Sequence, residues 1–177
     1  MEEKVLVLIK PDGLKKSLTG DIISKLSETK LIIVGAKIVK VSRELAEIHY
    51  SGLKKEQIAK KGKETGEKIY EDTLRYIQGE YHTDRVLALV YFGEDAINKI
   101  RELAGSTNPE KADPVSIRGK YGRIHSETGV FENVIHCSDS KENAEREIKI
   151  WFNPDEVYGT LYPVKKIREK IEKTTWA

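Results

Sequence analysis

The feature that most constrains this chain is an uninterrupted apolar run, Val5–Ile9, close to its first residue. A run of this kind, with no polar alternation, is typical of a central strand that is buried on both faces of a sheet. The turn-forming stretch Lys10-Pro11-Asp12-Gly13 ends the strand and leaves Lys10 at its end. The segment therefore predicts a sheet covered on both sides, with a charged group where its central strand stops.

Further apolar segments predict the remaining strands, at residues 31–41, at 86–92 and from 134 onwards. Helical spacing of apolar residues indicates helices at about residues 19–26, 95–104 and 141–152. A helical insert separates the second and third strands, and a long loop covers residues 105–132. This order predicts an α+β fold in which helices pack on a four-stranded sheet.

Length and composition favour one domain over residues 1–177, with the helical insert at about 51–82 and a tail at about 154–177. Apolar spacing in the tail indicates an amphipathic helix over residues 164–173. No apolar run approaches the roughly 20 residues that span a bilayer, and a single cysteine excludes an internal disulfide bond. We therefore expect a cytoplasmic protein without a membrane partner, and the net charge of +2 argues against nucleic acid as its main partner.

The insert begins with a basic segment, residues 54–68, which contains six lysines and three glutamates. Its apolar positions continue at helical spacing as far as Gly79, so the whole insert is predicted to be helical. Two interpretations remain open at this point: a solvated pair of helices, or a basic lid over a phosphate ligand.

Common catalytic templates are absent from the chain. It contains no GxxxxGK[ST] loop, no GxGxxG turn and no GxSxG elbow, which excludes a Walker-type phosphate loop, a dinucleotide fingerprint and a hydrolase nucleophile elbow. The four histidines have no metal-ligand spacing among themselves or with Cys137. Any catalytic chemistry must therefore come from a less common arrangement.

The most informative stretch is residues 133–140, Asn-Val-Ile-His-Cys-Ser-Asp-Ser, where a short strand passes into a helix. The start of a helix offers unpaired backbone N–H groups and a positive dipole, which suit a phosphate. A neutral imidazole such as that of His136 is a good nucleophile towards phosphorus near neutral pH. Taken alone, the stretch also fits a structural histidine beside serines that only cap the helix.

A second candidate cluster consists of Arg101, near the end of a predicted helix, with Thr107 and Arg118 in the long loop that follows. A loop of this length in a compact domain is unusual and is often functional. Guanidinium groups bind phosphate oxygens bidentately, and threonine adds a neutral donor. The alternative is that both arginines are solvated or paired with acidic residues.

Five motifs, taken in order, resemble those of the nucleoside diphosphate kinases: Ile9–Gly13, His49-Tyr50, Thr107–Pro109, Ile117–Gly119 and Asn133–Ser140. The resemblance covers most of the chain. It implies a ferredoxin-like α/β sandwich with an antiparallel sheet and a βαββαβ core, assembled as a hexamer or tetramer. It also implies an enzyme that transfers the γ-phosphate of a nucleoside triphosphate, typically ATP, to a nucleoside diphosphate in a ping-pong reaction, with Mg²⁺ on the nucleotide.

The resemblance also implies roles for single residues. His136 is similar to the nucleophile that becomes a phosphohistidine, Glu147 to the residue that orients its imidazole, and Ser138 to the hydroxyl beside that pair. Lys10 resembles the lysine that contacts the transferring phosphate. The implied nucleotide contacts are Lys10, Tyr50, Arg101, Thr107, Arg118, Asn133 and, for the base, Val130, while Mg²⁺ is expected on the phosphates and is reached through water by Asp139.

The sequence departs from the family pattern in its base-binding part. The aromatic residue that usually stacks on the base is absent from residues 53–59, so we expect base contacts from the longer insert, with Tyr70 and Tyr76 as candidates. Cys137 follows the implied nucleophile where a smaller residue is commoner. It is either a packing residue or a thiol whose oxidation blocks the site.

Two alternatives to an active enzyme remain open. The first is a catalytically weak regulator that binds nucleotides or nucleic acid on the same fold, suggested by the basic insert and the missing aromatic. Strongly salt-dependent binding without phosphoryl transfer would favour it. The second is a scaffold with no nucleotide role, which leaves the coincident lysine, arginine, asparagine and histidine unexplained.

Overall fold

The computed structural model describes residues 2–166. Its main sheet has the order β2-β3-β1-β6, with antiparallel neighbours throughout: β1 (Glu2–Ile9), β2 (Ile32–Lys40), β3 (Arg85–Glu94) and β6 (Ile135–Cys137). β1 lies inside this sheet between β3 and β6. The predicted four-stranded antiparallel sheet of the ferredoxin-like α+β fold is confirmed.

β1 divides the interior into two hydrophobic cores. Val5, Val7 and Ile9 face one core, Leu6 and Leu8 face the other, and all five side chains are fully buried. Successive side chains of a strand point to opposite faces, so a strand that is covered on both sides needs an apolar residue at every position. The absence of alternation in the sequence therefore reflects burial on both faces, as predicted.

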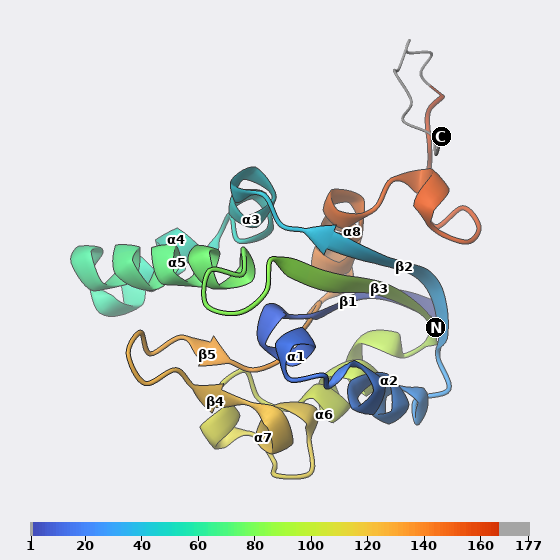
Figure 1. Ribbon diagram of the computed structural model, residues 1–177. Coiled ribbons are helices and arrows are strands. Elements are labelled where there is room, and N and C mark those ends of the chain that lie inside the picture. Colours follow the sequence, from blue (N-terminus) through green and yellow to red (C-terminus); the bar gives the residue numbers. More distant parts are fainter. Residues whose placement is uncertain (1, 167–177) are drawn as a thin grey trace, which may run out of the picture.

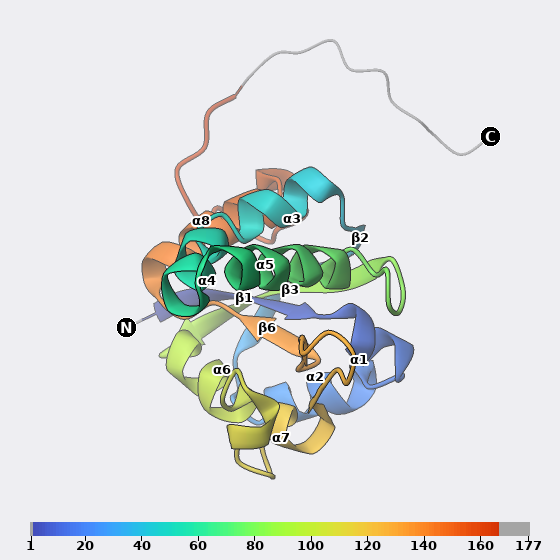
Figure 2. The ribbon, with the colours of Figure 1, turned by 90° about the vertical axis from the view of Figure 1, so that its left-hand side faces the viewer.

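Helices cover both faces of the sheet (Figures 1 and 2). α2 (Thr19–Ser27) and α6 (Ala96–Ala104) pack on one face and complete the βαββαβ core, and the short helix α1 (Pro11–Lys15) comes directly after β1. α3 (Arg43–His49), α5 (Lys63–Ile77) and α8 (Lys141–Trp151) pack on the other face. Arg146 of α8 donates to the carbonyl oxygen of Ile48 (3.3 Å) and so holds the end of α3 against α8.

The insert between β2 and β3 is a helical hairpin, as predicted. α4 (Leu53–Lys61) has no buried residues, whereas α5 buries one face: Tyr70, Leu74, Tyr76 and Ile77. The helices approach closely at Gly66, where a Cβ atom would lie 2.5 Å from the backbone nitrogen of Ile58. The lysines of α4 lie on the surface and partly pair with glutamates, for example Lys60 with Glu56 (2.6 Å). This arrangement favours a solvated helical pair over a basic lid.

Residues 105–132 are more regular than the predicted loop. They contain η1 (Pro109–Lys111), α7 (Ile117–Tyr121) and a two-stranded sheet of β4 (Arg123–Ile124) and β5 (Phe131–Glu132). These elements are too short for a hydrophobic period to be visible in the sequence. Gly119 is fixed by sterics, because a Cβ atom there would lie 2.0 Å from the carbonyl oxygen of Asp113.

The tail returns to the edge of the sheet. After η2 (Pro154–Glu156), Val157 bridges to Gly35 of β2, and the N–H of Tyr158 donates to the carbonyl oxygen of Val34 (2.6 Å). The amphipathic helix predicted for residues 164–173 lies largely outside the described residues. Within residues 2–166, none of the helices has the length and apolar character needed to cross a membrane.

Candidate active site

The imidazole of His136 lies on β6, where it is opposite Leu8 of β1. Its neighbours Ile135 and Cys137 point into a hydrophobic core, so His136 points to the other face of the sheet, towards α8. Its Nε2 atom lies 3.0 Å from Oε2 of Glu147, and 23% of the His136 side chain remains exposed. A carboxylate therefore holds the ring while solvent still reaches it.

Glu147 fixes the orientation and the tautomer of that ring. The same Oε2 atom accepts a hydrogen bond from Oγ of Ser138 (2.7 Å). Burial by itself raises the pKa of Glu147, but the hydrogen bonds from His136 and Ser138 and the charge of His136 outweigh burial and lower the pKa to about 2. The carboxylate is thus ionised at neutral pH and accepts from Nε2–H of His136, which leaves the free lone pair on Nδ1.

Glu147→Gln is expected to lower kcat by about 10²-fold, because a neutral amide holds the tautomer less firmly and does not offset charge on the imidazole.

The lowered pKa also predicts a stability effect. At pH values above the pKa of Glu147 in the unfolded chain, the ionised carboxylate contributes about 3 kcal/mol to the free energy of unfolding. This contribution is lost as the pH falls from about 4.5 to about 2. Urea unfolding should show a difference in the free energy of unfolding between wild type and Glu147→Gln that becomes smaller as the pH falls over this range. A difference that does not depend on pH would contradict the assignment.

A second imidazole packs against the candidate nucleophile. His49, the last residue of α3, is buried, and its ring meets that of His136 edge-on with the centroids 4.6 Å apart. Its Nδ1 atom accepts from Nε1–H of Trp151 (3.2 Å). Burial, followed by the charge of His136, lowers the pKa of His49 to about 3, so the ring stays neutral. The sequence showed His49 only as part of a motif and Trp151 only as an apolar residue.

Lys10 directly follows the last residue of β1 and is buried. Its Nζ atom donates to Oδ1 of Asn133 (2.8 Å) and to the carbonyl oxygen of Phe131 (3.4 Å), and it lies 4.5 Å from the ring centre of Tyr76. Nδ2 of Asn133 donates in turn to the carbonyl oxygen of Thr107 (2.7 Å). Asn133 therefore joins the lysine to the segment that follows α6.

The environment of Lys10 predicts a pH-dependent activity. Burial is the main cause that lowers the pKa of its ammonium group to about 8, so the free enzyme loses this positive charge as the pH rises through that value. We expect kcat/KM to fall on the alkaline side with an apparent pKa near 8. Lys10→Arg, which stays charged, should remove this alkaline limb even if its activity is lower. A limb that persists in Lys10→Arg would belong to another group.

Arg118 places a buried cation beside β6. Its Nη1 atom donates to the carbonyl oxygen of Gly105 (2.7 Å), and its Nη2 atom donates to that of Ile135 (3.1 Å), the residue before His136. Burial lowers the pKa of Arg118, although a guanidinium keeps its charge at neutral pH. Arg101 on α6 is exposed, and its charge acts on the same region as that of Arg118.

The sequence matches one known protein family over most of its length. The family described as nucleoside diphosphate kinase matches residues 3–157. A nucleoside diphosphate kinase of Staphylococcus aureus strain JH9 is 41% identical over 161 residues, with coverage of 91% of this chain and 95% of that protein. The chain belongs to the nucleoside diphosphate kinase family.

Solved structures of the nucleoside diphosphate kinase family agree with this assignment. A transition-state mimic of the Borrelia burgdorferi enzyme with bound vanadate and ADP has a TM-score of 0.76 and 30% identity, covering 89% of this chain and 91% of that one. An NDP kinase from Pyrobaculum aerophilum has a TM-score of 0.78 and 31% identity, covering 90% of this chain and all of that one (100%). In both cases the likeness covers about nine tenths of this chain.

Two of the residues proposed for base stacking, Tyr70 and Tyr76, do not present their rings to a ligand. Tyr70 and Tyr76 are both buried, Tyr70 in the core and Tyr76 against Lys10, so the expectation that they stack on a base is wrong. Amphipathic spacing made them candidates, yet the same spacing directs them inwards. Val130 lies next to β5 and has only 9% of its surface exposed.

The other predicted site residues differ in their burial and contacts. Tyr50 follows α3, and its ring meets that of His49 with the centroids 4.6 Å apart. Thr107 and Asp139 are exposed. Cys137 is buried and burial raises the pKa of its thiol, which favours packing over oxidation as its role.

The backbone is strained at Val134, two residues before His136. Val134 has a φ of +56°, which is unusual for a β-branched residue and costs about 1–3 kcal/mol. Its N–H donates to Oδ2 of Asp12 (3.0 Å), and its carbonyl oxygen accepts from the N–H of Lys10 (2.9 Å). The strained residue thus connects the turn after β1 to the strand that carries His136.

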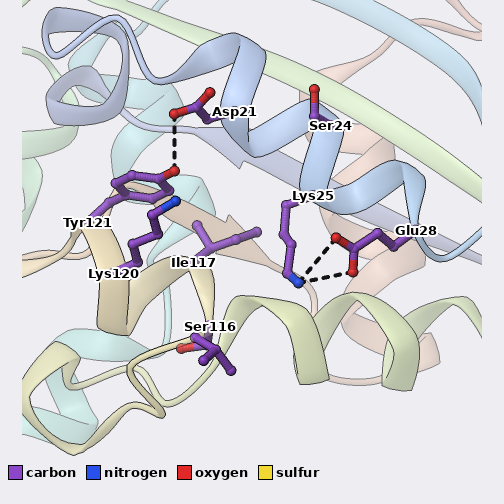
Figure 3. Close-up of a pocket in the computed structure, with 9 residues that line it drawn as sticks. Asp21, Ser24, Lys25, Glu28, Ser116, Ile117, Lys120 and Tyr121 are labelled. Atoms are coloured by element: carbon purple, nitrogen blue, oxygen red, sulfur yellow. Dashed lines mark hydrogen bonds and ion pairs between the residues drawn. The ribbon is translucent and has the colours of Figure 1, made fainter.

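Two cavities of about 390 Å³ each lie on the surface. One adjoins the candidate site and is lined by His49, Tyr50, Asp139 and Glu147, among others. The other lies between α2 and α7, away from His136, where Lys25 pairs with Glu28 and Tyr121 donates to Asp21 (Figure 3). Its lining contains none of the candidate residues, so this cavity lies outside the candidate site.

Proposed function

We propose that this chain is a nucleoside diphosphate kinase that transfers the γ-phosphate of a nucleoside triphosphate, typically ATP, to a nucleoside diphosphate through His136. The observation that carries the proposal is the contact of 3.0 Å between Nε2 of His136 and Glu147, with Ser138 on the same carboxylate oxygen. This geometry leaves Nδ1 as a nucleophile on a partly exposed ring. Lys10 and Arg118 supply positive charge on either side of β6.

The reaction divides into two displacements at phosphorus. Nδ1 of His136 attacks the γ-phosphorus, the bond to the bridging oxygen breaks, and the nucleoside diphosphate leaves. A terminal oxygen of the second nucleoside diphosphate then attacks the same phosphorus, and the N–P bond breaks. The Nε2 proton stays between His136 and Glu147 throughout, and the carboxylate offsets the positive charge of the phosphorylated ring.

Mg²⁺ enters this proposal on the nucleotide phosphates, where it neutralises their charge. Mg²⁺ prefers oxygen ligands. Among residues 2–166, the side chains of His49, His136 and Glu147 bring possible metal ligands within 4.8 Å of one another, but two of these three ligands are nitrogen atoms. Asp139 is exposed and lines the cavity beside Glu147, so its carboxylate fits a water-mediated contact to the metal.

Several features support the wider assignment. Strand β2 lies at the edge of the sheet and exposes Ile32, Ile33 and Ile38, which favours assembly into a homo-oligomer, a hexamer or tetramer. Both cores share β1, which favours a single catalytic domain over residues 1–177. The one cysteine is unpaired, as expected in the reducing cytoplasm.

The ping-pong scheme is tested by initial rates with ATP and GDP at several fixed concentrations. Double-reciprocal plots should give parallel lines, because the first product leaves before the second substrate binds. Intersecting lines would contradict a phosphoenzyme route. Nucleotide or nucleic-acid binding that weakens steeply with salt, without any transfer, would instead support the regulator.

A further inference from the structure

A closed series of contacts surrounds Lys10 and includes residues with no role in the reaction described above. The ammonium group lies over the ring of Tyr76, and this ring meets His82 edge-on with the centroids 5.7 Å apart. His82, in the loop after α5, has its Nε2 atom 2.8 Å from Oε1 of Glu132. The residues on each side of Glu132 accept the two hydrogen bonds of Lys10 and complete the series.

Glu132 is fully buried, although it is a carboxylate. A buried carboxylate is tolerated only where hydrogen bonds and positive charges replace water. Besides His82, it accepts a hydrogen bond from Nε of Arg123 on β4, and Lys16 and His125 lie at 3.9 and 4.0 Å. Through these contacts Glu132, which lies on β5, connects the loop after α5 with β4 and with Lys16, the residue just after α1.

The strained backbone of Val134 explains why the position of Glu132 matters. A β-branched residue keeps a positive φ only where the chain on both sides is fixed. On one side, β6 is fixed by its pairing with β1. On the other side, the side chain of Glu132 supplies the fixed point, held by His82 and Arg123.

We infer that Glu132 is a positioning residue for phosphoryl transfer: clamped by His82 and Arg123, it holds the main chain of Phe131 and the side chain of Asn133 on the ammonium group of Lys10. The inference rests on the proposed function, because Lys10 matters here as a contact to phosphate. It makes the end of the helical insert a working part of the active site. The negative charge of Glu132 also counteracts the effect of burial on Lys10, since it raises the pKa of that lysine.

Other charges act on the same pair and must be kept constant in a test. The groups that act on Lys10 are Asp12, Arg118, Glu132, Tyr76 and His49. The groups that face Glu132 are His82, Arg123, Lys16 and His125. Glu127 offers a matched control, because it is an exposed carboxylate in the same hairpin.

The test compares Glu132→Gln with Glu127→Gln and wild type. The titration of Lys10 is followed by NMR of ¹³C-labelled lysine, assigned with Lys10→Arg, and kcat/KM is measured across the same pH range. Glu132→Gln should move both the Lys10 titration and the alkaline limb of kcat/KM to lower pH by about 0.5 to 1 unit, while Glu127→Gln changes neither. At about pH 8 the KM for nucleotide should rise about 5-fold in Glu132→Gln.

If Glu132→Gln fails to fold, His82 carries the test. His82→Leu should shift the Lys10 titration and raise KM, and His82→Gln, whose amide replaces the Nε2–H donor, should restore both. An unchanged Lys10 titration and KM in Glu132→Gln, or in His82→Leu, would overturn the inference. The NMR titration needs no turnover, so an inactive wild type would defeat the proposed function while the coupling of Glu132 to Lys10 is still decided.

Discussion

His136→Asn is expected to lower the rate of phosphoryl transfer by at least about 10⁴-fold, because it removes the one protein atom in the proposed scheme that forms a bond to phosphorus. Asparagine keeps a polar side chain at the position, so the contact with Glu147 is replaced by a weaker one rather than by an empty space. The measurement is the steady-state rate of GTP formation from ATP and GDP. The alternative of a purely structural histidine predicts a loss of folding instead.

Binding and stability decide between these two explanations. His136→Asn should bind ADP within about 3-fold of the wild-type affinity and unfold at a similar urea concentration, because the proposed phosphate contacts of Lys10 and Arg118 remain. A variant that is unfolded would favour the structural interpretation. A folded variant with transfer near the wild-type rate would show that another residue carries the phosphoryl group.

Arg118→Gln is expected to lower kcat/KM by about 10²- to 10³-fold, because the variant loses a buried positive charge beside the proposed phosphate position. It also loses the bonds to the carbonyl oxygens of Gly105 and Ile135, which hold α7 against the end of α6 and against β6. Arg118→Lys should recover only part of the loss, since an ammonium group cannot bridge both carbonyls and still face a phosphate.

Two other arginines serve as controls for Arg118. Arg85→Gln, at the exposed start of β3, should leave kcat/KM unchanged. Arg101→Gln should lower it by about 10-fold only, because its exposed side chain works in a more strongly screened environment than Arg118. Equal losses in Arg101→Gln and Arg118→Gln would contradict the dependence on burial, and no loss in Arg118→Gln would remove it from the site.

The fold was predictable where one strand or helix carries its own signal. The unbroken apolar run of β1 indicated burial on both faces, and the turn after it placed Lys10 at its end. The polar stretch around His136 marked the start of α8 and the chemistry beside it. These signals are local, and the physical cause of each lies in the alternation or spacing of neighbouring side chains.

The remaining parts of the site depend on contacts between distant segments. His49 and Trp151 are 102 residues apart, and His82 and Glu132 are 50 apart, so no spacing in the sequence brings them together. The same limit explains the wrong expectation for Tyr76: its helical position was visible, but its place under Lys10 was not. The short elements between Gly105 and Glu132 were missed because their caps, such as Ser116, are single residues.

Labelling of the enzyme with γ-labelled ATP, followed by mapping of the phosphate, tests the central claim most directly. Wild type should take up label that is stable to base and labile to acid, that maps to Nδ1 of His136, and that leaves when GDP is added. His136→Asn should take up none. Absence of label on folded, nucleotide-binding wild type would contradict the account, and label retained by His136→Asn would keep the phosphotransferase but show that His136 is not its nucleophile.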